Sequence, residues 1–181
     1  RTTLRKAFLG PWNPMVDQIW LYALADAQRN TGVAVHLSTR MPNHHHTIVT
    51  PSDDNLPEFV RRLHRDVSCA IHKLLCEERY DAPGQLWDDR NPHYLRLMDE
   101  AAQMSHLGYA HLNAVAAGRV ERPGHLPGVA LDFHRWKGGA VEVAKPPLYF
   151  GKRRPKTLRL ELSPPPLLYR AFEGDVQRLI H

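Results

Sequence analysis

Three consecutive histidines stand near the start of an apolar, β-branched stretch, MPNHHHTIVT at residues 41–50. On a strand, successive side chains point to opposite faces, so His44 and His46 share one face and His45 points to the other. The Cα atoms of His44 and His46 are then about 6–7 Å apart, close enough for both imidazoles to bind one divalent metal ion. The pattern predicts half of a metal site. The alternative is a pair of hydrogen-bonded or partly exposed strand histidines.

A helix expected over residues 99–117 offers the groups that complete such a site. Tyr109 and Asn113 are four residues apart, so they lie one turn from each other on one helical face. The amide oxygen of Asn113 suits a hard ion such as Mg²⁺ or Mn²⁺ as a third ligand. Tyr109 would then lie beside anything bound to the metal. Taken alone, Tyr109 is more often a core or rim tyrosine, and the alternative for Asn113 is a helix C-terminal cap.

This set of side chains suits the attack of a tyrosine oxygen on a phosphodiester. A metal ion polarises a non-bridging phosphate oxygen and stabilises charge on the departing 3′ oxygen. The phenol, whose ordinary pKa is about 10, must lose its proton as it attacks, and a nearby cation helps that loss. The products are a covalent 5′-phosphotyrosine and a free 3′-OH. Because the covalent link keeps the energy of the phosphodiester, we expect a reversible step that needs no ATP.

Both segments resemble motifs of a known family. Residues 41–49 (MPNHHHTIV) resemble the HUH motif of the single-tyrosine transposases. Residues 109–118 (YAHLNAVAAG) resemble the family's Tyr-x-x-x-Asn-Pro-Val-x-x-Gly segment. The order and spacing of the two motifs fit, as does a Leu-Trp strand at residues 86–87. The branch that the chain resembles, over residues 1–120, is the REP-associated tyrosine transposases.

The resemblance implies a fold, an activity and roles for particular residues. The fold would be an α+β ferredoxin-like sandwich, with helices packed on a central antiparallel sheet. His44 and His46 would be metal ligands, with Asn113 as the third ligand and Tyr109 as the nucleophile. The enzyme, loaded with Mg²⁺ or Mn²⁺, would cleave and rejoin single-stranded DNA beside a palindromic hairpin. Such relatives include monomers and homodimers, and both states stay open.

Two positions depart from the family pattern. His45 stands where a hydrophobic residue is usual, and because it faces away from the metal its effect falls on packing. Ala114 stands where proline is common, which loosens the helix end at Asn113. Neither change removes a catalytic group. Two other functions stay open: a catalytically silent protein that binds DNA hairpins, and a metal-dependent phosphoesterase that uses water in place of Tyr109.

The composition fits a partner of negative charge. The 181 residues carry 24 Lys and Arg against 19 Asp and Glu, a formal charge of +5, and nucleic acid is the commonest acidic partner. No apolar run approaches the roughly 20 residues that span a bilayer. Cys69 and Cys76 lie about 10 Å apart along one expected helix, too far for a disulfide. Reduced thiols in or near the core suit a cytoplasmic protein.

Arginines are the candidate phosphate contacts. Those on the outer face of the helix expected from residue 56 are nearly balanced by acids, so a solvated face explains them equally well. Residues 135–159 hold eight Lys and Arg against one Glu. Cations interleaved with aromatic residues suit the backbone and bases of a single strand, the alternative being a solvated tail. The candidates are Arg5, Arg61, Arg62, Arg65, Arg90, Arg153 and Arg154.

Hydrophobic periodicity predicts the elements that position these groups. We expect a catalytic domain over residues 1–120 and a Pro-rich basic extension over residues 121–181. The expected helices are 15–30, 56–75, 99–117 and a short one at the C-terminus. The expected strands are a basic strand in 1–10, a hairpin over 33–50, an irregular edge strand in 85–97 and a short strand at 158–162.

Overall fold

In the computed structural model of the chain, strand β1 (Ala34–Arg40) lies between β2 (His45–Thr50) and β3 (Ala130–Leu131) in an antiparallel sheet. The structure describes residues 2–3, 7–89, 92–123 and 125–180, so Arg5 and Arg90 lie outside the described residues. Helices pack on this small sheet, and the expected α+β class is confirmed. No helix in the described part of the chain is long and apolar enough to cross a membrane.

The β1–β2 hairpin sets the orientation of the three histidines. Its turn is tight, because the N–H of Met41 donates to the carbonyl of His44 over 2.8 Å. Thr39 pairs with His46 and Arg40 pairs with His45. A bulge at the other end of β1 is held by the imidazole of His36, whose two nitrogens contact the Ser163 carbonyl and the Thr50 hydroxyl. The expected hairpin is therefore confirmed.

Two isolated bridges extend the sheet beyond β2. Thr2 pairs antiparallel with His44, and Thr3 pairs antiparallel with Trp87. The edge strand expected in 85–97 is wrong beyond Trp87, because its other described residues form no strand pairing. Trp87 turns inward and its indole N–H donates to the His64 carbonyl over 2.9 Å, while Pro92 has no N–H to offer a neighbouring strand.

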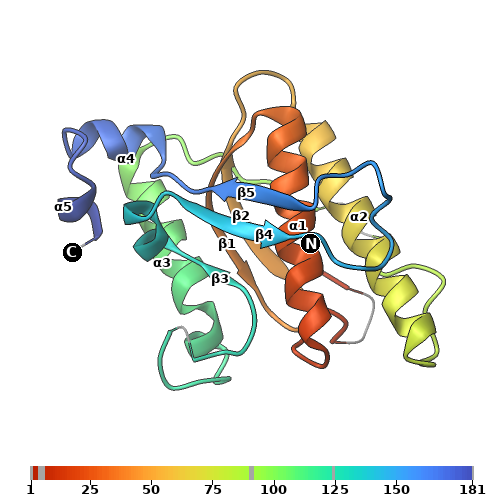
Figure 1. The fold of residues 1–181 in the computed structure, drawn as a ribbon. Coiled ribbons are helices and arrows are strands. Elements are labelled where there is room, and N and C mark those ends of the chain that lie inside the picture. Colours follow the sequence, from red (N-terminus) through yellow and green to blue (C-terminus); the bar gives the residue numbers. More distant parts are fainter. Residues whose placement is uncertain (1, 4–6, 90–91, 124, 181) are drawn as a thin grey trace.

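Helix α1 (Pro14–Thr31) passes between the sheet and the β4–β5 hairpin, which Figure 1 shows in front of it. Asn13 caps its start, accepting the N–H of Met15 over 2.8 Å, and Gly32 ends it in the left-handed conformation at φ 71°. On one side the Trp20 indole donates to Ser38 of β1. On the other side the Tyr22 hydroxyl donates to the Pro155 carbonyl. This double burial explains why the middle of the helix, residues 19–25, is wholly apolar.

Two further helices hold the site from opposite faces of the sheet. Helix α2 (Leu56–Glu77) packs beside α1, on the face to which His45 points. Helix α3 (Glu100–Ala116) lies against the other face, where the Thr39 hydroxyl donates to the Ala110 carbonyl over 3.3 Å. Asp99 caps α3 by accepting the Ala102 N–H. All three long helices expected from the sequence are confirmed.

Residues beyond 120 continue the same core. After β3 come the 3₁₀ helix η1 (Phe133–Lys137), the antiparallel pair β4 (Ala140–Ala144) and β5 (Thr157–Glu161), and the helices α4 (Pro166–Ala171) and α5 (Val176–Ile180). Trp136, Phe150 and Leu160 are buried in one cluster with the residues of α1 and β1. The strand at 158–162 and a C-terminal helix are confirmed, and the alternative of a solvated tail is wrong. The domain boundary at residue 120 stays a prediction.

Candidate active site

The side chains of the three histidines alternate between the two faces of the sheet, as expected for residues on a strand. The rings of His44 and His46 lie on one face, with centroids 5.1 Å apart and planes at 87°. His45 lies on the other face, 4.7 Å from the Trp20 ring and with its Nε2 3.0 Å from Nε2 of His64. The side chain that departs from the family pattern is therefore a packing residue between α1 and α2.

Helix α3 brings the second half of the site to the histidine pair. The Tyr109 and His46 rings are 5.4 Å apart between centroids, with planes at 84°. The side chain of Asn113 lies close enough to His44 to interact with it and raise its pKa. Two segments more than 60 residues apart in the sequence thus meet through two pairs of side chains. The prediction that these segments touch is confirmed in the geometry, whereas the catalytic and ligand roles of the four residues stay predictions.

Both histidines of the pair are held neutral near pH 7. The pKa of His46 is lowered from its ordinary 6.5 to about 4. Burial is the larger cause, and the neighbouring His44 is the next. Burial also lowers the pKa of His44, and the interaction with Asn113 partly offsets this. A neutral imidazole keeps a lone pair on one nitrogen, which is the form that binds a metal ion.

One ring nitrogen of each histidine fits a divalent cation. Nδ1 of His44 lies 2.9 Å from Oδ1 of Asn43, which as an acceptor places the proton on Nδ1 and leaves the Nε2 lone pair for a ligand. Nε2 of His46 is buried and finds no hydrogen-bond partner among the described residues. Leaving a buried polar nitrogen unpaired costs about 1–3 kcal/mol, a cost that a bound metal removes. His44, His46 and Asn113 thus fit the expected metal.

The residues of the site differ in their exposure to solvent. The Tyr109 side chain lies on the surface, with 56% of its area exposed, whereas Asn113 behind it is buried. A phenol in this position can reach the backbone of a macromolecule in solution. Nε2 of His46 is also buried, whereas His44 is half-buried. The arrangement suits a nucleophile attacking a large external substrate rather than a small molecule enclosed in a cavity.

The candidate DNA-binding arginines that the structure describes are mostly paired within the chain. Arg61 and Arg62 both donate to Glu58, and Arg65 donates to Asp66. Arg154 is partly buried, with Nη1 2.5 Å from Asp66 and 3.3 Å from Asp26. Arg153 beside it is exposed. Contact with DNA stays a prediction for each of them, and for Arg154 it competes with two buried carboxylates.

A third group of titratable side chains lies on the other side of α3. His111, Asp132 and His134 place their ligand atoms within 4.8 Å of one another. From the sequence, His111 reads as a solvated or core histidine. The pattern Asp-x-His at 132–134 gives no sign of a partner 21 residues before Asp132. The fold alone, by laying η1 beside α3, reveals the cluster.

The structure therefore brings His44, His46, Tyr109 and Asn113 together at one place between β2 and α3. No protein-family model, curated protein or solved structure matches this chain. Function is inferred from the residues and their geometry.

Proposed function

We propose that the protein is a metal-dependent endonuclease and strand transferase for single-stranded DNA, of the single-tyrosine transposase type. The observation that carries the proposal is the meeting of Tyr109 with His46, beside the contact of Asn113 with His44. These four residues are the chemical groups of the two sequence motifs that resemble the family. A formal charge of +5 favours a nucleic-acid substrate.

The connectivity supports a ferredoxin-like core for this enzyme. Along the chain come bridge residues Thr2 and Thr3, then helix α1, strands β1 and β2, helix α2, and the bridge residue Trp87. The bridges among these strand segments are antiparallel, and α1 and α2 pack side by side. This order resembles the split βαβ arrangement. β2 pairs with β1 along its length, and His44 just before it bridges Thr2, which makes this segment a rigid mount for His44 and His46.

Tyr109 acts as the nucleophile. Its phenolic oxygen forms a bond to phosphorus and releases its proton to solvent, to which the side chain is open. The bond between phosphorus and the 3′ oxygen breaks, and that oxygen keeps the electron pair and takes a proton from water. When bound, Mg²⁺ or Mn²⁺ would supply charge stabilisation for this step. His44, His46 and Asn113 would hold the ion, and α3 keeps the phenol beside them.

The reverse reaction rejoins strands with the same groups. A 3′-OH, either the original one or that of a second strand, attacks the phosphotyrosine, and Tyr109 leaves with its electron pair. Because a phosphodiester is exchanged for a phosphodiester, no other energy source is needed. Cleavage and transfer thus need only that the 5′ end stays attached to Tyr109 between the two attacks.

The test is the formation of a covalent protein–DNA adduct. Single strands copied from the DNA that flanks the coding sequence, including any palindromes there, are labelled at the 3′ end, because the segment 3′ of the cut stays on the protein. We expect a labelled adduct with Mn²⁺ or Mg²⁺, and its loss in Tyr109→Phe. Tyr94→Phe is the matched control, since Tyr94 is as exposed as Tyr109 but outside the site. His44→Gln and His46→Gln should also abolish the adduct.

Two other results of this experiment would indicate a different function. Cleavage that persists in Tyr109→Phe would mean that water is the nucleophile and the protein is a phosphoesterase. Hairpin binding without an adduct under either metal would mean a catalytically silent DNA-binding protein. Both results would overturn the proposal.

A further inference from the structure

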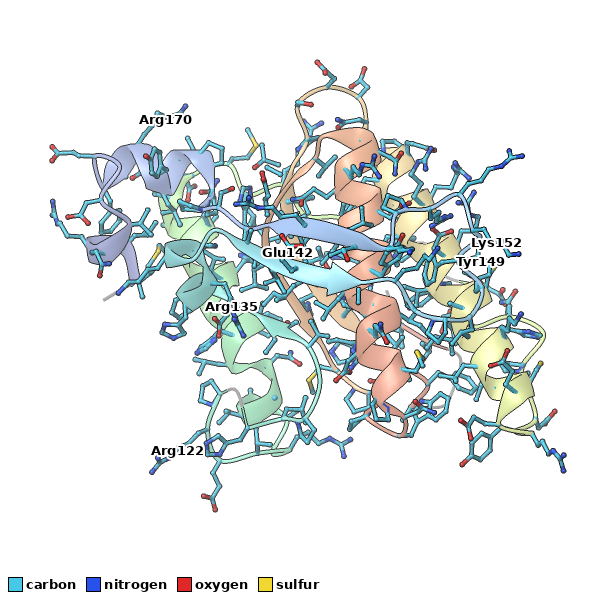
Figure 2. The ribbon with its side chains drawn as sticks, viewed as in Figure 1. Arg122, Arg135, Glu142, Tyr149, Lys152 and Arg170 are labelled. Atoms are coloured by element: carbon cyan, nitrogen blue, oxygen red, sulfur yellow. The ribbon has the colours of Figure 1, made fainter. Side chains whose placement is uncertain are left out.

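We propose that His111, Asp132 and His134 form a second metal site, for a transition-metal ion of the Zn²⁺ class, that clips helix α3 to η1. The three residues come from two parts of the chain. His111 lies in the middle of α3, whereas Asp132 caps the start of η1 and His134 lies in its first turn. Figure 1 shows η1 lying against α3, and Arg135, labelled in Figure 2, marks the same segment.

The donor atoms are already close to one another. Nδ1 of His111 lies 3.1 Å from Oδ2 of Asp132, and all three ligand atoms lie within 4.8 Å of one another. Ligands at about 2.0–2.2 Å from a tetrahedral Zn²⁺ are separated by similar spacings, so small side-chain rotations suffice to seat an ion. Two imidazoles and one carboxylate are a donor set that Zn²⁺ uses with a water as fourth ligand.

The surroundings hold these donors in place. The other oxygen of Asp132, Oδ1, accepts the backbone N–H of His134 over 3.1 Å, which fixes the carboxylate. The Phe133 ring lies 4.7 Å from the His111 ring and 4.5 Å from the His134 ring, giving an apolar wall. The side chains of His111 and Asp132 are 17% and 14% exposed, while His134 is on the surface. The site is half-buried, with one open side for water.

This site is separate from the one that holds His44 and His46. His111 follows Tyr109 by two residues and precedes Asn113 by two, so its side chain lies about 200° around the helix from each. The two sites therefore lie on opposite sides of α3. A metal on His111 would tie the helix that carries Tyr109 to η1, whose Trp136 is anchored by its indole N–H on the His36 carbonyl over 2.8 Å. The second metal would hold the nucleophile-bearing helix in position.

The experiment measures Zn²⁺ binding in the full chain, in a background that lacks the first site. His44→Gln/His46→Gln protein, stripped with a chelator, is titrated with Zn²⁺ by calorimetry. We expect about one tight equivalent. Adding His134→Ala or Asp132→Asn should weaken that binding by more than about 10-fold. Both changes spare the fold, because His134 is exposed and asparagine still caps a helix. His93→Ala, an exposed histidine elsewhere, should change nothing.

Two results would overturn the proposal. Zn²⁺ binding that His134→Ala and Asp132→Asn leave unchanged would place the ion on other histidines. The lack of any tight Zn²⁺ binding would leave His111 and Asp132 as a polar contact without a metal. A cobalt-loaded sample gives a second readout, since a four-coordinate Co²⁺ here should show strong visible absorption that His134→Ala removes. Neither readout depends on DNA cleavage, so the proposed nuclease activity can fail while this site stands.

Discussion

The ring of Tyr109 on α3 stands edge-on to the ring of His46 on β2, with centroids 5.4 Å apart and planes at 84°. One partner is an exposed phenol, and the other is a neutral imidazole whose buried Nε2 finds no partner in the described part of the chain. A nucleophile and a ligand nitrogen are thus adjacent, although they lie on different elements. The Thr39 hydroxyl fixes their spacing, because Thr39 pairs with His46 in the sheet and donates to the Ala110 carbonyl, next to Tyr109.

Acid should destabilise the metal-free protein through His46. The pKa of this group is about 4 in the folded state and about 6.5 when unfolded, so the unfolded chain binds more protons between these values. The stability that neutral His46 contributes is complete above pH 6.5 and is lost as the pH falls towards 4. At pH 5 the loss should be about 2 kcal/mol.

Urea unfolding at pH 7.5 and pH 5 measures this loss. The wild type should lose more stability between the two pH values than His46→Gln does, by about 2 kcal/mol. His93→Gln serves as the control and should behave like the wild type, since His93 is exposed. An equal loss in the wild type and in His46→Gln would show that His46 is not buried as described.

Arg154 should be a structural residue and Arg153 a surface one. Arg154 binds the Asp66 carboxylate, which is 1% exposed, and that of Asp26, and it thereby ties the β4–β5 loop to α1 and α2. Figure 2 shows Tyr149 on the same loop, and the Tyr149 hydroxyl also donates to Asp66. Arg154→Met should cost about 3 kcal/mol, because it leaves buried carboxylates without a cation.

The matched variant Arg153→Ala should change stability by less than about 0.5 kcal/mol. If Arg153 contacts phosphate, the Arg153→Ala substitution should also reduce the slope of log K for DNA binding against log salt concentration by about one unit. Chemical denaturation and binding titrations at several salt concentrations separate the two effects. Equal stability of Arg154→Met and the wild type would contradict the structural role.

Asp17 should matter for stability through Arg40. The Arg40 side chain is only 1% exposed and is ion-paired with Asp17, while its Nε and Nη1 find no partner among the described residues. Burial lowers the pKa of Arg40, and Asp17 opposes that shift. Asp17→Asn should therefore cost about 2–3 kcal/mol, measured by thermal or urea unfolding. Asp53→Asn, on an exposed loop, is the control; a similar cost in both variants would rule out a special role for the pair.

Local sequence signals predicted the elements that hold the site. Asn13 with Pro14, and Asp99, cap α1 and α3 as their residue types suggest, and Gly32 ends α1 in the left-handed conformation. The period of two in β2 predicted that His44 and His46 share a face. The helical spacing of four predicted that Tyr109 and Asn113 do so as well. These features depend on residues that are close together in the sequence, so one amino-acid sequence is enough to predict them.

Features set by tertiary contacts were not predictable from local pattern. Residues 135–159 look like a basic tail, yet Phe150 and Leu158 are buried against α1 because the β4–β5 pair covers that helix. The charge of Arg154 is neutralised by Asp26 on α1 and Asp66 on α2, which lie about 90–130 positions earlier in the sequence. Trp87 reads as a strand residue, but in the described part of the chain it forms an isolated bridge to Thr3 rather than a place in a strand. The cluster around His111 depends on the packing of η1 in the same way.

The most direct test of the central claim is to identify the residue that becomes linked to DNA. After incubation with the labelled single strand and Mn²⁺, the adduct is digested with nuclease and protease, and its peptides are sequenced by mass spectrometry. We predict a single modified peptide, with the 5′ phosphate of the DNA on the oxygen of Tyr109. A modification at another residue, or cleaved DNA with unmodified Tyr109 and no adduct, would contradict the account.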